Sequence, residues 1–96
     1  MDAGEFEWDE AKAESNLVKH NVSFEAAHRV FDDVFADERC DFDSAPDEIR
    51  YVITGRVNEV VLRVVYTERE ERIRIISARK ATANEEEEYY RSQTSE

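Results

Sequence analysis

Arginine side chains are concentrated in one third of the chain. Residues 50–80 hold eight basic and four acidic residues, whereas the rest of the chain holds five basic and twenty acidic ones. A guanidinium group stays charged and its planar fork bonds two phosphate oxygens at once, so this segment is suited to binding phosphate. Its basic residues are Arg50, Arg56, Arg63, Arg69, Arg72, Arg74, Arg79 and Lys80.

Two of these arginines occupy unusual positions. Arg63 interrupts the run VVLRVV, which otherwise has the composition of a buried strand, and a buried charge is costly unless a partner or ligand pairs with it. Arg79 precedes a predicted helix start, where a bound phosphate would also meet free backbone amides. Arg72 and Arg74 alternate with isoleucines, which is equally the pattern of a half-exposed strand face.

Few residues are candidates for proton transfer. Lys19 and His20 lie at the predicted end of a helix, where His20 could equally cap the helix carbonyls. We interpret His28 as an ordinary helix residue and the four glutamates at 85–88 as a solvated helix start. Tyr89 and Tyr90 are predicted to pack that helix on the sheet.

Several classes of site and location are excluded. The sequence lacks a phosphate-binding loop, zinc spacing, a nucleophile elbow and a dinucleotide-binding turn. The single cysteine, Cys40, rules out an internal disulfide and a cysteine-based metal site. No apolar run approaches about 18 residues, and the acidic N-terminus does not resemble a secretion signal. We therefore expect a cytoplasmic protein without a metal, a cofactor or membrane contact.

The elements that would position these residues follow from local signals, and ninety-six residues accommodate one domain, residues 1–96. Asp9 is a good N-cap for a helix over 10–19, and Asn21 can end it in the left-handed conformation. Ser23 caps a second helix from 24 to about 33. Its apolar residues recur every three or four positions, as Phe24, Ala27, Phe31, Val34 and Phe35.

The second half of the chain is predicted to be mostly strand. A loop over 36–48, with an edge strand around 38–42, precedes β-rich runs at 50–55, 60–67 and 72–78. Their short connections, RVNE and EREE, predict an antiparallel meander. A capping box of Thr82 and Glu85 begins a helix of about 83–92, and a disordered tail is predicted from about 92. The predicted fold is α+β, with a three- to four-stranded antiparallel sheet and helices on one face.

The acid excess, a net charge of −11, has two competing explanations. One is mimicry of nucleic acid, or an acidic tail that binds a basic partner. The other is adaptation to molar intracellular salt, where a carboxylate-rich, lysine-poor surface stays solvated. Because the acids are spread over the chain and only three lysines are present, we favour the salt explanation and a halophilic source. At about 1 M salt the screening length is only ~3 Å, so local rather than global charge would decide binding.

Four blocks of the chain, in order over residues 6 to about 90, resemble the BrnT family of bacterial and archaeal type II toxins. The blocks are FEWD with Lys12 and Asn16; KHNVSFEA with VFDD; Arg50, Gly55-Arg56 and VYTER; and RIRIISARKAT. The resemblance implies a RelE-like fold, cleavage of RNA, and neutralisation by a BrnA-type antitoxin. That antitoxin carries a ribbon-helix-helix element, so operator DNA would be bound only through it. The acidic composition and Asn21, where a glycine is usual, depart from the family.

The residues present can be matched to the chemistry of a metal-independent endoribonuclease. Attack by the substrate's own 2′-hydroxyl needs a base, an acid and cations around the phosphorane. The candidate catalytic residues are Lys19 and His20 for proton transfer, with Arg56, Arg63 and Arg79 for charge. The candidate RNA-binding residues are Arg50, Arg72, Arg74 and Lys80, and the supporting residues are Glu59 and Tyr66. The alternative is a non-catalytic module whose basic sheet holds an acidic protein partner or operator DNA.

Overall fold

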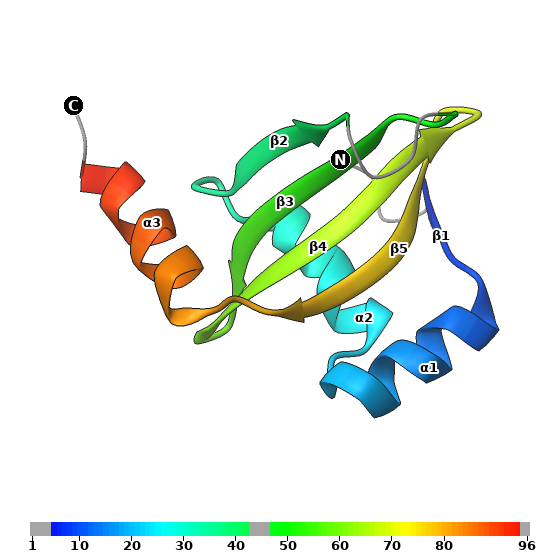
Figure 1. Cartoon of the computed structure of the whole chain (residues 1–96), viewed down its shortest axis with the longest axis horizontal. Helices are drawn as coiled ribbons and strands as arrows, with labels where there is room; N and C mark the ends of the chain where they lie inside the picture. The colour runs from blue at the N-terminus through cyan, green and yellow to red at the C-terminus, as the bar shows by residue number, and fades with distance from the viewer. Residues whose placement is uncertain (1–4, 43–46, 95–96) are drawn as a thin grey trace.

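The chain folds into one sheet flanked by helices, and the computed structural model describes residues 5–42 and 47–94. The elements are β1 (Phe6–Glu7), α1 (Glu10–His20), α2 (Phe24–Ala27), the 3₁₀ helix η2 (His28–Asp32), β2 (Asp37–Asp41), β3 (Arg50–Val57), β4 (Val60–Arg69), β5 (Arg72–Lys80) and α3 (Ala83–Thr94) (Figure 1). The α+β class is confirmed. Among the described residues, no helix combines the length and apolar character needed to cross a bilayer.

The sheet has five strands in the order β1-β5-β4-β3-β2 and is mixed, with β1 parallel to β5 and the other neighbours antiparallel. The predicted meander of β3, β4 and β5 and the predicted edge strand, β2, are confirmed. The prediction of three or four antiparallel strands is wrong for β1. A strand of two residues has no periodic pattern to detect, and it forms because Phe6 and Glu7 pair with Ile73 and Arg74 across the chain.

The helix termini follow the predicted caps. The Asp9 carboxylate accepts a hydrogen bond from the Ala11 amide at 2.9 Å, and Asn21 takes the left-handed conformation with φ of 59°. The Ser23 hydroxyl accepts from the Ala26 amide at 3.0 Å. These contacts lie within three residues of sequence, which is why local patterns predict them.

The second predicted helix is shorter than expected. Regular α-helix ends at Ala27 and continues as the 3₁₀ helix η2 to Asp32. The His28 ring donates a hydrogen bond of 2.6 Å to the Glu25 carbonyl, an acceptor that a longer α-helix would use for its backbone. Because the helical path stops at Asp32, Val34 and Phe35 are exposed and do not belong to the core, contrary to the predicted apolar face.

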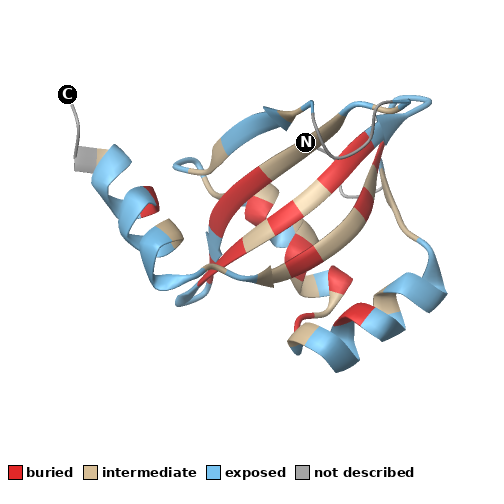
Figure 2. Ribbon diagram, in the orientation of Figure 1, coloured by how far each residue is buried: buried red, intermediate tan, exposed pale blue. Residues whose placement is uncertain are grey.

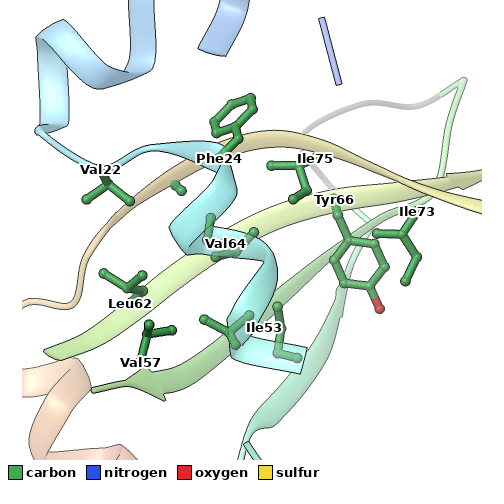
Figure 3. Close-up of a cluster of buried hydrophobic side chains, with 12 residues drawn as sticks. Val22, Phe24, Ile53, Val57, Leu62, Val64, Tyr66, Ile73 and Ile75 are labelled. Atoms are coloured by element: carbon green, nitrogen blue, oxygen red, sulfur yellow. The ribbon is translucent and has the colours of Figure 1, made fainter. Parts of the chain in front are cut away.

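The core lies between the sheet and the α2–η2 segment. Figure 3 shows strand side chains pointing toward this segment, among them Ile53, Leu62, Val64 and Ile75. Phe24 and Val30 from the helices meet them and are fully buried. Burial alternates along the strands (Figure 2), so the opposite face of the sheet carries the other side chains.

Helix α3 departs from the predicted arrangement. It leaves β5 beyond the strand ends, away from α1 and α2 (Figure 1), and its Glu85 contacts the sheet face opposite the core. The prediction that all helices cover one face is therefore wrong for α3. The helix runs to Thr94, and residues 95 and 96 of the predicted tail lie outside the described residues.

Candidate functional site

Eight of the ten arginines point to one face of the sheet, the face opposite α2. Residues paired across neighbouring strands point to the same side, and alternate residues of a strand share a side. The pairs Thr54–Arg63 and Arg63–Arg79 place both arginines opposite the core. The same pairing register places further arginines of β2, β3, β4 and β5 on this side. Arg56 points to the same side but lies at the end of β3, beyond its pairing with β2, and lines a separate pocket described below. The arginine face is the other seven: Arg39, Arg50, Arg63, Arg69, Arg72, Arg74 and Arg79.

Three carboxylates each hold two arginines of this face. Glu7 lies 3.0 Å from Arg74 and 3.6 Å from Arg72. Glu48 lies 3.1 Å from Arg50 and 3.7 Å from Arg69. The third is Glu85 of α3, and Arg39 pairs with Asp37 of its own strand. Four carboxylates thus offset only part of the charge of seven arginines, through pairs that solvent and salt weaken where they are exposed.

Glu85 makes the strongest of these contacts. The Arg79 guanidinium donates two hydrogen bonds to it, at 2.8 and 2.9 Å, and Arg63 Nε lies 3.4 Å from Oε2. The Arg79 hydrogen bonds, with further contributions from the Thr82 amide and the charge of Arg63, lower the pKa of Glu85 from 4.5 to about 2 despite its partial burial. The same hydrogen bonds raise the pKa of Arg79. The pair is therefore fully ionised at neutral pH.

The predicted capping box explains why Glu85 is held at this point. The Glu85 backbone amide donates to Thr82 Oγ1 at 3.2 Å, and the Glu85 side chain accepts from the Thr82 amide at 2.9 Å. Between α3 and the sheet lies a cleft of about 50 Å³, lined by Thr54, Arg63 and Glu85 together with Asp37, Arg39, Glu88, Tyr89 and Ser92. The Glu85 side chain thus caps the start of α3 and also binds Arg63 and Arg79.

Several of the predicted site residues lie elsewhere. Lys19 and His20 end α1, which packs on the side of the sheet that carries the core. Tyr66 is buried on that same side, where its ring stacks with Tyr51, because it shares the inward alternation of Leu62 and Val64. The structure does not place these residues with Arg63 and Arg79.

The remaining predicted residues are at the end of the sheet. Lys80 pairs with Leu62 and lies near the end of α1, on the core side. Glu59 is in the exposed β3–β4 turn. Arg56, at the end of β3, donates from Nε to the Asn58 carbonyl at 2.9 Å and belongs to a separate pocket. Of the predicted set, the arginine face contains Arg50, Arg63, Arg72, Arg74 and Arg79.

That separate pocket, the α3 pocket, has a volume of about 440 Å³ and lies between η2, the end of β3 and α3. Asp33 lies at its base, where it accepts hydrogen bonds from the Tyr89 hydroxyl and from the backbone amides of Arg56 and Phe35. Burial opposes ionisation of Asp33, but these hydrogen bonds outweigh it and lower its pKa. Burial and the Asp33 contact together raise the pKa of Tyr89. Asp33 and Tyr89 therefore join α3 to the η2–β2 corner.

Three of these partner residues were not singled out from the sequence. Glu7 lies in a two-residue strand, Glu48 precedes β3, and Asp33 is 56 positions from Tyr89. Period-two alternation would have shown that Tyr66 faces away from Arg63. No local signal, in contrast, identifies which carboxylate reaches which arginine.

The described residues hold no group of three His, Cys, Asp or Glu side chains arranged to bind a metal ion. Comparison with known families gives a match over residues 8–85, to the family described as the ribonuclease toxin BrnT of type II toxin–antitoxin systems. This match includes the whole sheet from β2 to β5 and reaches Glu85 in α3. No curated protein matches the chain.

Proposed function

The chain belongs to the BrnT family of type II toxin–antitoxin ribonuclease toxins, and from this premise we propose that its arginine face binds and cleaves RNA without a divalent metal. The attacking group is the 2′-hydroxyl of the substrate. The observation that carries the proposal is the gathering of seven arginines on one sheet face, in a protein whose net charge is −11. A strongly acidic chain gains nothing in solubility from such a gathering.

Arg63 and Arg79 are the proposed catalytic residues. They are cross-strand neighbours on central strands, and both contact the carboxylate of Glu85. A carboxylate and a phosphate can each present two oxygens to the planar fork of an arginine. The Arg79 guanidinium already binds two such oxygens, those of Glu85. We place the scissile phosphate where Glu85 now lies.

Arg50, Arg72 and Arg74 are the proposed contacts to the rest of the RNA backbone. They lie on the same face, toward the other end of the strands, where their partners are Glu48 and Glu7. When an RNA phosphate replaces a surface carboxylate beside an arginine, one weak ion pair is exchanged for another. The contribution of each position to the salt dependence of RNA affinity should therefore be modest.

The proposed reaction is an internal transfer at phosphorus. The 2′-oxygen forms a bond to phosphorus as it loses its proton, and the bond from phosphorus to the 5′-oxygen breaks as that oxygen gains one. The first product carries a 2′,3′-cyclic phosphate. Arg63 and Arg79 stabilise the negative charge of the phosphorane, which is usually the largest single contribution to catalysis. Both histidines, His20 and His28, lie on the core side, so protons pass to and from water.

Membership of a type II toxin family implies an antitoxin partner and an RNA substrate. We propose that the partner is a BrnA-type ribbon-helix-helix protein. In that arrangement operator DNA is bound through the ribbon-helix-helix element of the antitoxin. The 2′-hydroxyl requirement separately excludes DNA as a cleavage substrate.

The test is cleavage of an oligoribonucleotide in the presence of a chelator and molar potassium chloride. We expect cleavage to persist, to yield cyclic phosphate ends, and to stop at a position whose 2′-hydroxyl is replaced by hydrogen. Loss of activity on chelation, with recovery on adding magnesium, would refute the metal-independent mechanism. Binding of RNA without any cleavage would instead support a non-catalytic module.

A further inference from the structure

The distribution of ion pairs singles out the α3 pocket. Within residues 5–42 and 47–94, eight of the ten arginines lie within 4 Å of a carboxylate. The two without such a pair are Arg29 and Arg56, and both line the α3 pocket. The Arg56 guanidinium donates to the Asn58 carbonyl, and its charge helps to lower the pKa of Asp33, but neither arginine lies within 4 Å of a carboxylate among the described residues. In a chain with 24 acidic and 13 basic residues, two such guanidinium groups at one pocket are a specific feature.

The same pocket carries exposed aromatic rings. Phe35 is 57% exposed and Tyr90 is 38% exposed, and neither is needed to close the core. The Tyr90 ring lies edge to face with the Tyr89 ring, with the two ring centroids 5.0 Å apart. Aromatic faces beside arginines are the usual combination for binding single-stranded nucleic acid, because bases stack on the rings and phosphates meet the cations.

The acidic groups of the pocket do not cancel this combination. Asp33 is engaged by three donors, namely the Tyr89 hydroxyl and two backbone amides, so its charge is already compensated. Asp32 is exposed at the rim. The volume of about 440 Å³ falls within the range of ~300–1,000 Å³ that small-ligand sites occupy, and it is large enough for one nucleotide.

The pocket also lies next to the arginine face. Tyr89 lines both the α3 pocket and the cleft that contains Arg63 and Glu85, so α3 has one site on each side. We propose that the α3 pocket binds one nucleotide of the RNA substrate, outside the cleaved step, with the base stacked on Tyr90 or Phe35 and the phosphate held by Arg29 and Arg56. This inference rests on the proposed ribonuclease function and names a subsite for it.

The experiment measures affinity separately from cleavage. The probe is a fluorescent single-stranded oligoribonucleotide with 2′-O-methyl groups throughout, which cannot be cleaved by the proposed mechanism. We expect Tyr90→Leu and Arg29→Ala each to weaken binding by about tenfold, because stacking and phosphate contacts are lost. Tyr90→Phe should bind as the wild type does, since it keeps the ring. Arg91→Ala, an exposed charge on the same helix, is the matched control.

Cleavage kinetics then locate the subsite. On a long substrate the two variants should raise KM and leave kcat unchanged, whereas on a dinucleotide they should match the wild type. The inference is overturned when Tyr90→Leu and Arg29→Ala bind the oligoribonucleotide as tightly as the wild type, or when Arg91→Ala loses as much RNA affinity as they do. It is also overturned when these variants weaken only the binding of a protein partner. A wild type that binds the probe but cleaves no RNA contradicts the proposed function and leaves the subsite standing.

Discussion

Glu85→Gln is the substitution that separates the structural role of Glu85 from its place among the arginines. Glutamine keeps the shape of the side chain and can still complete the capping box with Thr82. The change removes the negative charge and one of the two acceptor oxygens that the arginines contact. A pKa that falls from 4.5 to about 2 would correspond to roughly 3 kcal/mol in a shielded site. The Glu85 side chain is 21% exposed and that of Arg79 is 38% exposed. Solvent screening therefore reduces our expected loss of stability to about 1–2 kcal/mol.

The pH dependence gives this prediction its sign. The pKa of Glu85 is lower in the folded state than its ordinary value of 4.5. The contribution of Glu85 to the free energy of unfolding is therefore complete above pH 4.5 and is lost as the pH falls toward about 2. The difference in the free energy of unfolding between wild type and Glu85→Gln should thus be largest at neutral pH and shrink on acidification. Urea denaturation at a series of pH values measures it.

Glu87→Gln is the matched control, since Glu87 lies on the same helix and makes an exposed ion pair with Arg91. We expect it to cost less than about 0.5 kcal/mol. Glu85→Gln should also bind the non-cleavable RNA several-fold more tightly, because Arg63 and Arg79 lose the negative charge that competes with phosphate. Equal losses of stability for the two variants, or a difference that does not change with pH, would refute the reasoning.

Three further predictions concern the fold. Asn16→Leu should cost about 2–4 kcal/mol in urea denaturation, because the buried Asn16 amide bonds the Val22 carbonyl and both backbone groups of Ala78, while the exposed Ser15→Ala should be neutral. Gly55→Ala should cost about 1–3 kcal/mol by the same measurement, since its Cβ would lie 3.1 Å from Val30 Cβ and from the Val30 carbonyl oxygen; a stability equal to wild type would contradict that contact. The melting temperature should rise between ~0.1 and ~2 M potassium chloride because of the net charge of −11, and a flat curve would favour the acidic-partner explanation.

Local chemistry made much of the fold predictable. Asp9, Ser23 and the Thr82–Glu85 box mark helix starts by contacts within three residues, and strong β propensity marks β3, β4 and β5. The short turns between these strands then require antiparallel neighbours. The parts that failed depend on distant contacts. β1 exists through its pairing with β5, and α3 is positioned by Tyr89 and Asp33.

The candidate site was predictable only in part. Segment composition located the arginines, and alternation along β4 could have separated Arg63 from Tyr66. Strict alternation along β5 would have put Arg74 and Arg79 on opposite faces, and the register shift opposite Val65 and Tyr66 brings them to the same one. The choice of Lys19 and His20 relied on residue type, and residue type does not report which side of a sheet a helix covers. The paired carboxylates at 7, 48 and 85 required the three-dimensional register.

The rate of RNA cleavage by Arg79→Ala, measured beside its melting temperature, tests most directly whether the arginine face is the site of cleavage. Loss of the charge-assisted contacts to the phosphorane should cost ~3 kcal/mol or more at the transition state, which is a ~100-fold slower rate. Arg91→Ala, which removes an exposed arginine of α3, controls for a general loss of positive charge. We predict that Arg79→Ala stays folded and loses at least this factor, while Arg91→Ala cleaves as the wild type does. Equal cleavage by wild type and Arg79→Ala at matched stability would contradict the assignment of catalysis to this face.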